Sequence, residues 1–268
     1  MVVAKRLEPA SRLQVRRRHV DNAEMTSLEQ PNADQGGTRT RVASSADPAR
    51  TIPEMTESSL SIVMPVFNER RTVEAAVQDA LVADLPVTRR QVIVVDDGST
   101  DGTTELLRGR SWPVNVTIVH HGGNRGKGAA IRTGLEHADC EFAAILDADL
   151  EYQAADIGLL LDPLIAGEAN VVFGTRSWSS HAAFSFWYVM GNKAVTFATN
   201  LLFNCWISDV MTCHKAMRTE LFRTLPLRER GFAIEPEIAA RVMQAGERIY
   251  EVPIAYKARG RDEGKKLT

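Results

Sequence analysis

The chain has 268 residues, of which 44% are hydrophobic and 25% charged, with 32 basic and 34 acidic side chains and a net charge of −2. This composition is that of an ordinary globular protein with enough chain for one large or two small domains. It lacks the basic surface that nucleic-acid binding normally needs, so we expect no nucleic-acid partner. Cys140, Cys205 and Cys213 form no CxxC pair, which predicts neither a disulfide framework nor a zinc site and favours a reducing, cytoplasmic setting.

The first segment, residues 1–59, differs from the rest of the chain. It is rich in Arg, Ser, Asp and Pro and has no sustained apolar period, so we expect a disordered N-terminal extension. A signal peptide is not predicted, because polar residues follow the basic stretch 12–18 where an apolar segment would be needed. Attraction of this stretch to an anionic membrane is one interpretation, and a solvated tail is the simpler one.

From residue 60 onward, short apolar runs alternate with segments of helical period. Strands are predicted at residues 60–64, 91–95, 114–119, 142–146 and 170–173. Helices are predicted at about residues 69–83, 103–108, 128–137 and 155–166. Continuous apolar strands separated by helices indicate βαβ units. We therefore expect one α/β domain over residues 60–268, with a Rossmann-like, mostly parallel sheet that has helices on both faces.

Polar and acidic residues follow three of these strands, at residues 65–69, 96–103 and 147–151. Ligands of open α/β sheets bind beyond the carboxyl ends of the strands, so these loops form a candidate site. Any one loop alone is weak evidence, because Asp, Ser and Gly at a strand end commonly cap a helix or form a turn.

The pair Asp147 and Asp149 is stronger evidence for a ligand site than any one of these loops. With period-two geometry both side chains project to the same side, and two like charges destabilise each other unless a cation neutralises them. A hard divalent ion held by one or two carboxylates and by substrate phosphate oxygens is the usual solution. The spacing therefore predicts a site for Mg²⁺ or Mn²⁺ and a diphosphate.

A glycine-rich segment, residues 122–128, is predicted to open a helix, where backbone N–H groups can receive an anion. It is not a P-loop, because only three residues separate Gly122 from Gly126, and Gly128 stands where Ser or Thr should bind a metal. It does not match GxGxxG either, so a nicotinamide cofactor is not predicted.

Five segments occur together in the order and spacing of a known family: residues 65–69, 96–103, 124–128, 147–151 and 174–176. In these motifs the chain resembles the family 2 glycosyltransferases with the GT-A fold, and among them the dolichyl- or polyprenyl-phosphate sugar (mannose) synthases. The resemblance extends from residue 60 to the C-terminus. It implies a metal-dependent, inverting transfer of a hexose, mannose or glucose, from a GDP- or UDP-sugar to a polyprenyl phosphate of the dolichyl type.

The resemblance also implies roles for the matching residues. The base and ribose of the nucleotide-sugar would lie among Pro65, Phe67, Glu69, Val95 and Asp97. The metal ion would be held by Asp147, Asp149 and Glu151, with Ala148 beside its diphosphate. Phosphates of the donor or acceptor would be contacted by Lys127, Arg176, Arg259 and Lys265.

The acceptor decides whether the reaction needs a general base. A phosphate monoester is already largely ionised at neutral pH, whereas a hydroxyl must give up its proton to a carboxylate. Asp209 is the candidate base for a hydroxyl acceptor, and the expected catalytic residues are Asp149, Arg176 and Asp209. Two alternatives stay open: a soluble or glycan hydroxyl acceptor, and a catalytically silent nucleotide-sugar-binding protein, against which the intact acidic pair argues.

The apolar stretch at residues 184–207 bears on the acceptor, because a polar stripe of Asn192, Thr196, Asn200 and Asn204 recurs in it every four residues. The stretch is too interrupted to span a bilayer, which takes about 20 predominantly apolar residues. It is either an amphipathic surface in the membrane interface that receives a lipid phosphate, or a helix packed on the protein's own sheet. The first alternative predicts peripheral attachment to the inner face of the plasma membrane and is compatible with a partner membrane protein.

Overall fold

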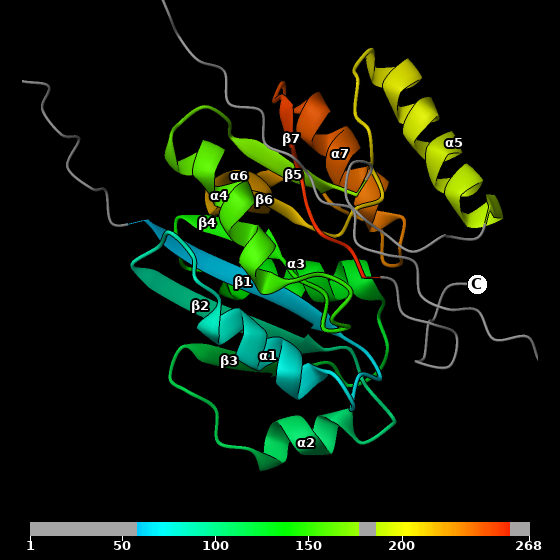
Figure 1. Cartoon of the computed structure of the whole chain (residues 1–268). Coiled ribbons are helices and arrows are strands. Elements are labelled where there is room, and N and C mark those ends of the chain that lie inside the picture. The colour runs from blue at the N-terminus through cyan, green and yellow to red at the C-terminus, as the bar shows by residue number, and fades with distance from the viewer. Residues whose placement is uncertain (1–57, 177–185, 258–268) are drawn as a thin grey trace, which may run out of the picture. The chain divides into compact units, whose positions relative to one another are not determined.

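The computed structural model describes residues 58–176 and 186–257. The predicted extension therefore lies outside the described residues apart from its last two positions, and so do Arg259 and Lys265. Strand β1 begins at Ser59, one residue before the expected start of the domain. Within the described residues the chain forms one seven-stranded sheet with helices packed against it (Figure 1).

The sheet has the strand order β3-β2-β1-β4-β6-β5-β7. Five strands lie within two residues of their predicted positions: β1 (Ser59–Val66), β2 (Arg89–Asp96), β3 (Val116–His120), β4 (Phe142–Ile145) and β5 (Val171–Thr175). The sequence reasoning missed two further strands, β6 (Lys215–Arg218) and β7 (Ile249–Pro253). Every pairing is parallel except those of β6, which runs antiparallel to β4 and β5. The mostly parallel sheet is thus confirmed.

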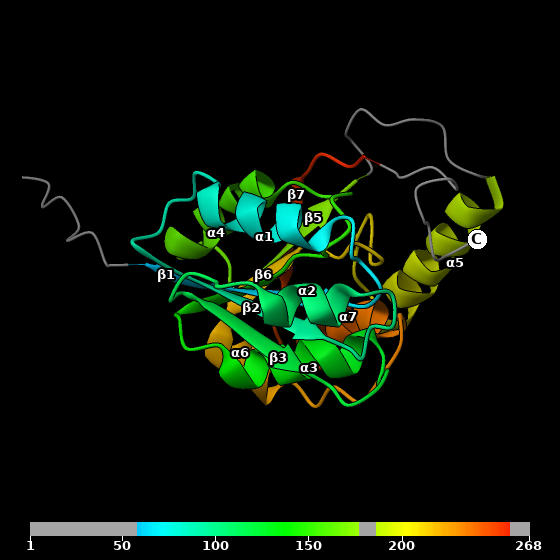
Figure 2. The same cartoon turned by 90° about the horizontal axis from the view of Figure 1, so that it is seen from below.

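Helices cover both faces, as predicted. One face carries α1 (Val73–Val82) and α4 (Ile157–Ile165), which follows the short helix η1 (Ala154–Asp156). The other face carries α3 (Lys127–His137), α6 (Thr219–Thr224) and α7 (Ile234–Gln244). Figure 2 shows α1 and α4 on one side of the sheet and α3 and α6 on the other. Two more helices, α2 (Thr103–Gly109) and α5 (Phe186–Phe203), complete the described part.

Strand β1 shows why the sheet sits between two helical layers. Its alternate residues Leu60, Ile62 and Met64 are fully buried against the α1 and α4 side, whereas Val63 is buried against the α3 side. A Cβ atom on Gly134 of α3 would lie 2.4 Å from Cγ1 of Val63, so only glycine lets this helix approach the strand so closely. The central strand, apolar on both faces, thereby fixes the positions of the loops at its carboxyl end.

Candidate active site

A cavity of about 740 Å³ lies at the carboxyl ends of β1, β2 and β4. Ten of the residues predicted from the sequence line it: Pro65, Phe67, Glu69, Asp97, Lys127, Asp147, Ala148, Asp149, Glu151 and Arg176. The structure therefore brings together side chains that lie up to 111 residues apart in the chain, as the edge-of-sheet argument predicts.

Of the predicted residues that the structure describes, Val95 and Asp209 do not line the cavity. Val95 is fully buried in the core layer between the sheet and α3, so its side chain does not take the expected place beside the base. Asp209 lies behind Arg176 and is 7% exposed. The side chain of Val95 packs in the core, and that of Asp209 forms an ion pair with Arg176.

The floor of the cavity contains a buried ammonium group. Nζ of Lys127 lies 2.9 Å from Oδ2 of Asp147, 2.9 Å from Oε1 of Glu235 and 3.0 Å from Sγ of Cys213. The contacts with Asp147 and Cys213 are hydrogen bonds, and the contact with Glu235 is an ion pair. Burial alone would lower the pKa of Lys127, but the neighbouring carboxylates outweigh it and hold the pKa well above its ordinary value. Lys127 is thus charged, and it forms ion pairs with two carboxylates of the protein itself.

Glu235 extends this pairing into the core. Its Oε2 lies 2.5 Å from Nζ of Lys215, a side chain with no exposed surface that also donates to the carbonyl groups of Val210 and Thr212. Burial would raise the pKa of Glu235, but Lys127 and Lys215 lower it to about 2. The side chains of Asp147, Lys127, Glu235 and Lys215 thus form a chain of alternating charges, here called the charge chain.

Three backbone N–H groups of the glycine-rich segment donate to acceptors of the protein itself. The N–H groups of Arg125 and Gly126 donate to the carboxylate of Asp97, at 2.9 and 2.7 Å, and the N–H of Gly128 donates to the carbonyl of Arg230. Gly126 has a φ of 94°, and a Cβ atom there would lie 2.3 Å from the same carbonyl oxygen. The anion that the segment receives is therefore the protein's own Asp97.

The acidic loop after β4 departs from the predicted three-carboxylate metal centre. Oδ2 of Asp147 accepts from Lys127, Oδ1 of Asp149 accepts from the N–H of Glu151, and Oε2 of Glu151 accepts from the hydroxyl of Tyr256 at 2.5 Å. Among residues 58–176 and 186–257, no three Asp, Glu, His or Cys side chains converge as a metal site. Glu151 is turned toward Tyr256, so Asp147 and Asp149 are left as a two-carboxylate set, which suits an ion whose coordination is completed by substrate phosphates.

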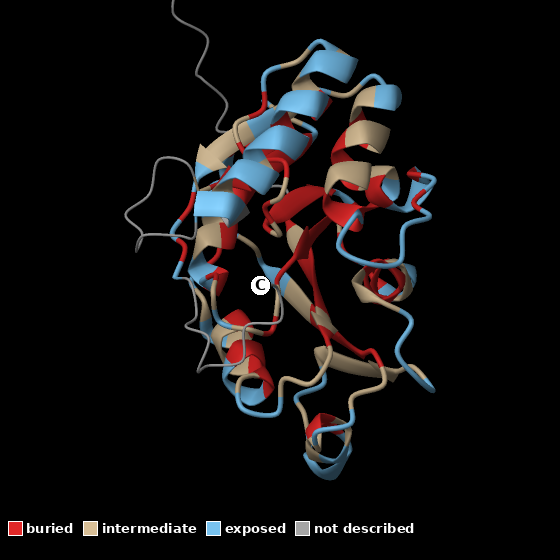
Figure 3. Cartoon of the chain, turned by 90° about the vertical axis from the view of Figure 1, so that its right-hand side faces the viewer, coloured by how far each residue is buried: buried red, intermediate tan, exposed pale blue. Residues whose placement is uncertain are grey.

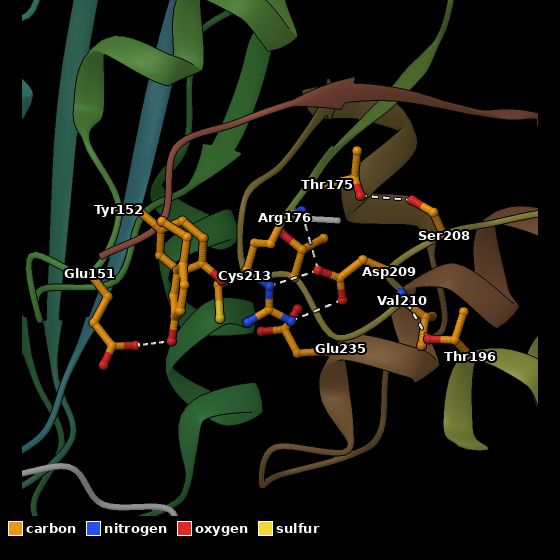
Figure 4. A network of polar contacts seen from close by, with 12 residues as sticks. Glu151, Tyr152, Thr175, Arg176, Thr196, Ser208, Asp209, Val210, Cys213 and Glu235 are labelled. Carbon is orange, nitrogen blue, oxygen red and sulfur yellow. Dashed lines mark hydrogen bonds and ion pairs between the residues drawn. The ribbon is translucent and has the colours of Figure 1, made fainter. Parts of the chain in front are cut away.

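Arg176 and Asp209 form a bidentate pair (Figure 4). Nε donates to Oδ2 at 2.7 Å and an Nη atom donates to Oδ1 at 2.9 Å, so both carboxylate oxygens are engaged. The guanidinium also lies 5.1 Å from the ring centre of Tyr256. Arg176 lines the cavity while Asp209 does not, so the pairing with Asp209 fixes the orientation of a guanidinium at the cavity wall.

Several cavity residues had no predicted role in the site: Tyr152, Cys213, Glu235 and Tyr256. Glu235 had a local signal, since it is an acidic residue within an apolar stretch at the start of a helix. Its partner Lys127 is 108 residues earlier in the chain, and no sequence pattern links the two.

Taken together, the parallel sheet, the acidic loop at its carboxyl edge and the cavity above it define an α/β protein built to bind a ligand with phosphate groups. The family model described as glycosyl transferase family 2 matches residues 61–225. The chain belongs to this family and has the GT-A fold.

Two comparisons place the chain among known proteins. It is 29% identical over 205 residues to Glycosyltransferase AglJ of Haloferax volcanii, covering 76% of this chain and 65% of AglJ, which is less than two thirds of that protein. It also resembles solved structures of glucosyl-3-phosphoglycerate synthase from Mycobacterium tuberculosis. The complex with phosphoglyceric acid has a TM-score of 0.55 at 23% identity, over 77% of this chain and 74% of that one. The complex with Mn²⁺, UDP and glucosyl-3-phosphoglycerate has a TM-score of 0.56 at 22% identity, with the same coverage.

The charge chain predicts a particular response to acid. The pKa of Glu235 is lowered from 4.5 to about 2, so its pairing stabilises the fold above pH 4.5 and is lost as the pH falls toward 2. Glu235→Gln leaves Lys127 and Lys215 without their shared carboxylate and should cost about 3–5 kcal/mol at pH 7. Urea unfolding between pH 7 and pH 2.5 measures both effects.

The variant should then lose less stability than the wild type on acidification between pH 4.5 and pH 2. Glu136→Gln, which changes an exposed glutamate on α3, is the matched control and should follow the wild-type curve. If the free energy of unfolding fell in parallel with pH in the wild type and in Glu235→Gln, the lowered pKa of Glu235 would be contradicted.

Proposed function

We propose that this glycosyltransferase is metal-dependent and inverting and that it transfers a hexose, mannose or glucose, from a GDP- or UDP-sugar to a polyprenyl phosphate on the cytoplasmic face of a membrane. The observation that carries the proposal is helix α5, whose polar side faces the protein and whose apolar side faces outward. The helix also borders the cavity through Trp187, Gly191 and Asn192.

Helix α5 has the reverse polarity of an ordinary surface helix, which buries its apolar side. Thr196 and Thr199 are each 7% exposed. Thr196 accepts a hydrogen bond from the N–H of Val210, and Asn200 bonds both backbone groups of Ile207. Thr196 and Asn200 of the predicted polar stripe therefore hold the helix on the protein, whereas Asn192 lines the cavity and Asn204 is exposed.

The outward side of the helix and the segment after it carry large apolar side chains: Phe186, Trp187, Met190, Phe197, Leu201, Leu202 and Trp206. Leu202 is 78% exposed and Trp206 is 88% exposed. Figure 3 shows α5 facing the viewer and exposed over most of its length. A contiguous apolar surface of this kind marks an interaction site.

A lipid surface fits this side of α5 best. Trp187 and Trp206 lie near its two ends, and tryptophan favours the boundary between headgroups and acyl chains. Lys193 is the one charged residue of α5, a cation that suits anionic headgroups. No helix among the described residues is long and apolar enough to cross a bilayer. The proposed contact is therefore interfacial, with the cavity mouth beside the lipid surface.

The donor would bind over the acidic loop. Asp147 and Asp149 would hold a divalent cation together with the diphosphate, and the cation would supply charge stabilisation for the departing nucleoside diphosphate. Solved structures of glucosyl-3-phosphoglycerate synthase contain Mn²⁺ with UDP or UDP-glucose, which supports this donor class. Pro65, Phe67, Glu69 and Asp97 line the cavity on the side of β1 and β2, where the nucleotide would lie.

A phosphate acceptor fits the pairing of Asp209. Both of its oxygens accept hydrogen bonds from Arg176, so taking a proton from a hydroxyl would disrupt that pair. An ionised phosphate needs no base, because its oxygen carries the charge with which it attacks. The bond from that oxygen to the anomeric carbon forms as the bond from the anomeric carbon to the diphosphate breaks, which inverts the configuration. Arg176 would stabilise the phosphate charge during this step.

The role of Asp209 can be tested through Asp209→Asn. As a positioning residue, its loss should lower kcat/KM by about 10- to 100-fold, the effect of losing one charge-assisted hydrogen bond, while the pH profile keeps its shape. Transfer from UDP-glucose or GDP-mannose with Mn²⁺ to a short polyprenyl phosphate is the assay. Transfer to a hydroxyl acceptor that disappears in the variant together with the acidic limb of the profile would favour a general base instead.

The membrane contact can be tested with a double variant on the outward side of α5. Leu201→Ser with Leu202→Ser should release the protein from vesicles of phosphatidylcholine, phosphatidylglycerol and polyprenyl phosphate in a flotation assay, because it removes apolar surface that would enter the interface. Transfer to a short, water-soluble prenyl phosphate should stay at the wild-type rate, since neither residue lines the cavity.

Val82→Ser is the matched control, because Val82 is 76% exposed but lies on α1. It should float with the vesicles as the wild type does. Equal flotation of the double variant and this control would refute the membrane contact.

A further inference from the structure

The residues that follow β7 join two parts of the site that come from different loops. The N–H of Ile254 donates to the carbonyl oxygen of Thr175, the last residue of β5, at 3.1 Å. The N–H of Lys257 donates to the carbonyl oxygen of Glu151, in the acidic loop after β4, at 2.9 Å. Residues 254–257, here called the strap, therefore run from the end of β5 to the acidic loop.

Tyr256 lies within the strap, and its side chain contacts both parts of the site. Its hydroxyl donates to Oε2 of Glu151 at 2.5 Å, and its ring centre lies 5.1 Å from the guanidinium carbon of Arg176. A guanidinium over an aromatic ring is attracted by the electrons of the ring. Tyr256 is 6% exposed and lines the cavity. One side chain thus connects Arg176 to the acidic loop at the wall of the cavity.

Buried groups hold Tyr256 in this place. Its ring centre lies 5.1 Å from that of Tyr152, which in turn stacks on His214 at 4.6 Å. Both of these supporting rings are buried. The N–H of Ala255 donates to Oδ2 of Asp156 at 2.8 Å, which fixes the backbone beside Tyr256. The ring therefore cannot move relative to Arg176 without loss of packing or of a hydrogen bond.

We infer that Tyr256 is a positioning residue, which sets the distance between Arg176 and the acidic loop. The inference rests on the proposed function, in which Asp147 and Asp149 hold a cation with the diphosphate and Arg176 stabilises the acceptor phosphate. During transfer, negative charge passes from the acceptor phosphate to the diphosphate, so both stabilising groups must stand at the separation that the transition state requires. A misplacement of about 1 Å can lower the rate of such a step about 100-fold.

Kinetics of two variants test this role. Tyr256→Leu removes the ring and the hydroxyl, so kcat should fall about 10- to 100-fold while the KM of the nucleotide-sugar changes by less than about threefold. Tyr256→Phe keeps the ring over Arg176 and loses only the hydroxyl, so its kcat should lie between those of the wild type and Tyr256→Leu. The assay is transfer from UDP-glucose or GDP-mannose with Mn²⁺ to a short polyprenyl phosphate.

Tyr250→Leu is the matched control, because Tyr250 is a tyrosine of β7 that is 46% exposed and does not line the cavity. This variant should keep the wild-type kcat. Wild-type kcat in Tyr256→Leu would overturn the inference. A higher KM at unchanged kcat would overturn it too, because that is the result of losing a direct contact with the bound substrate.

A double-mutant cycle on the free energy of unfolding tests the link to the acidic loop without any substrate. Tyr256→Phe and Glu151→Ala remove the two ends of one hydrogen bond, so the loss in the double variant should be smaller than the sum of the single losses. Additive losses in urea unfolding would overturn the inference. If the wild type transfers no hexose to polyprenyl phosphate, the proposed acceptor is contradicted, and the cycle then decides on the role of Tyr256 as a link.

Discussion

The site depends on the charge chain of Asp147, Lys127, Glu235 and Lys215. These four residues come from the loop after β4 and from α3, α7 and β6, so four separate elements meet at one set of ion pairs. Removing charged groups from water is costly, and an unpaired member would destabilise the fold by several kcal/mol. The elements must therefore pack in the arrangement that pairs all four, and this places Asp147 at the edge of the cavity with its charge already balanced.

A second constraint orders the nucleotide side of the cavity. Asp97 holds the backbone of the glycine-rich segment, and Gly126 and Gly128 let that segment lie directly against residues 229 and 230. The loop after β2, the start of α3 and the segment before α7 are thus fixed to one another before any ligand binds. Such preorganisation lets donors and charges act on a ligand without first being rearranged.

The sequence allowed the sheet, five strands and ten of the residues that line the cavity to be predicted, because apolar runs and polar strand ends are local signals. It could not show that Glu235 pairs with Lys127 or that Glu151 turns to Tyr256, since these pairs form only between distant segments. Strand β6 has the sequence KAMR and so lacks the continuous apolar run that marked β4, a strand of the same length. For α5 the polar stripe was visible, but only the structure shows that Thr196 and Asn200 face the protein and leave the apolar side outward.

A crystal structure of the full chain with Mn²⁺ and UDP would test the charge chain and the cavity together. We expect the diphosphate above Asp147 and Asp149, with the ammonium of Lys127 still between Asp147 and Glu235. We also expect Glu235 to keep its contact with Lys215. A structure in which Lys127 has left Glu235 to bind the diphosphate directly would contradict the claim that the charge of Lys127 is balanced by Asp147 and Glu235 before the ligand binds.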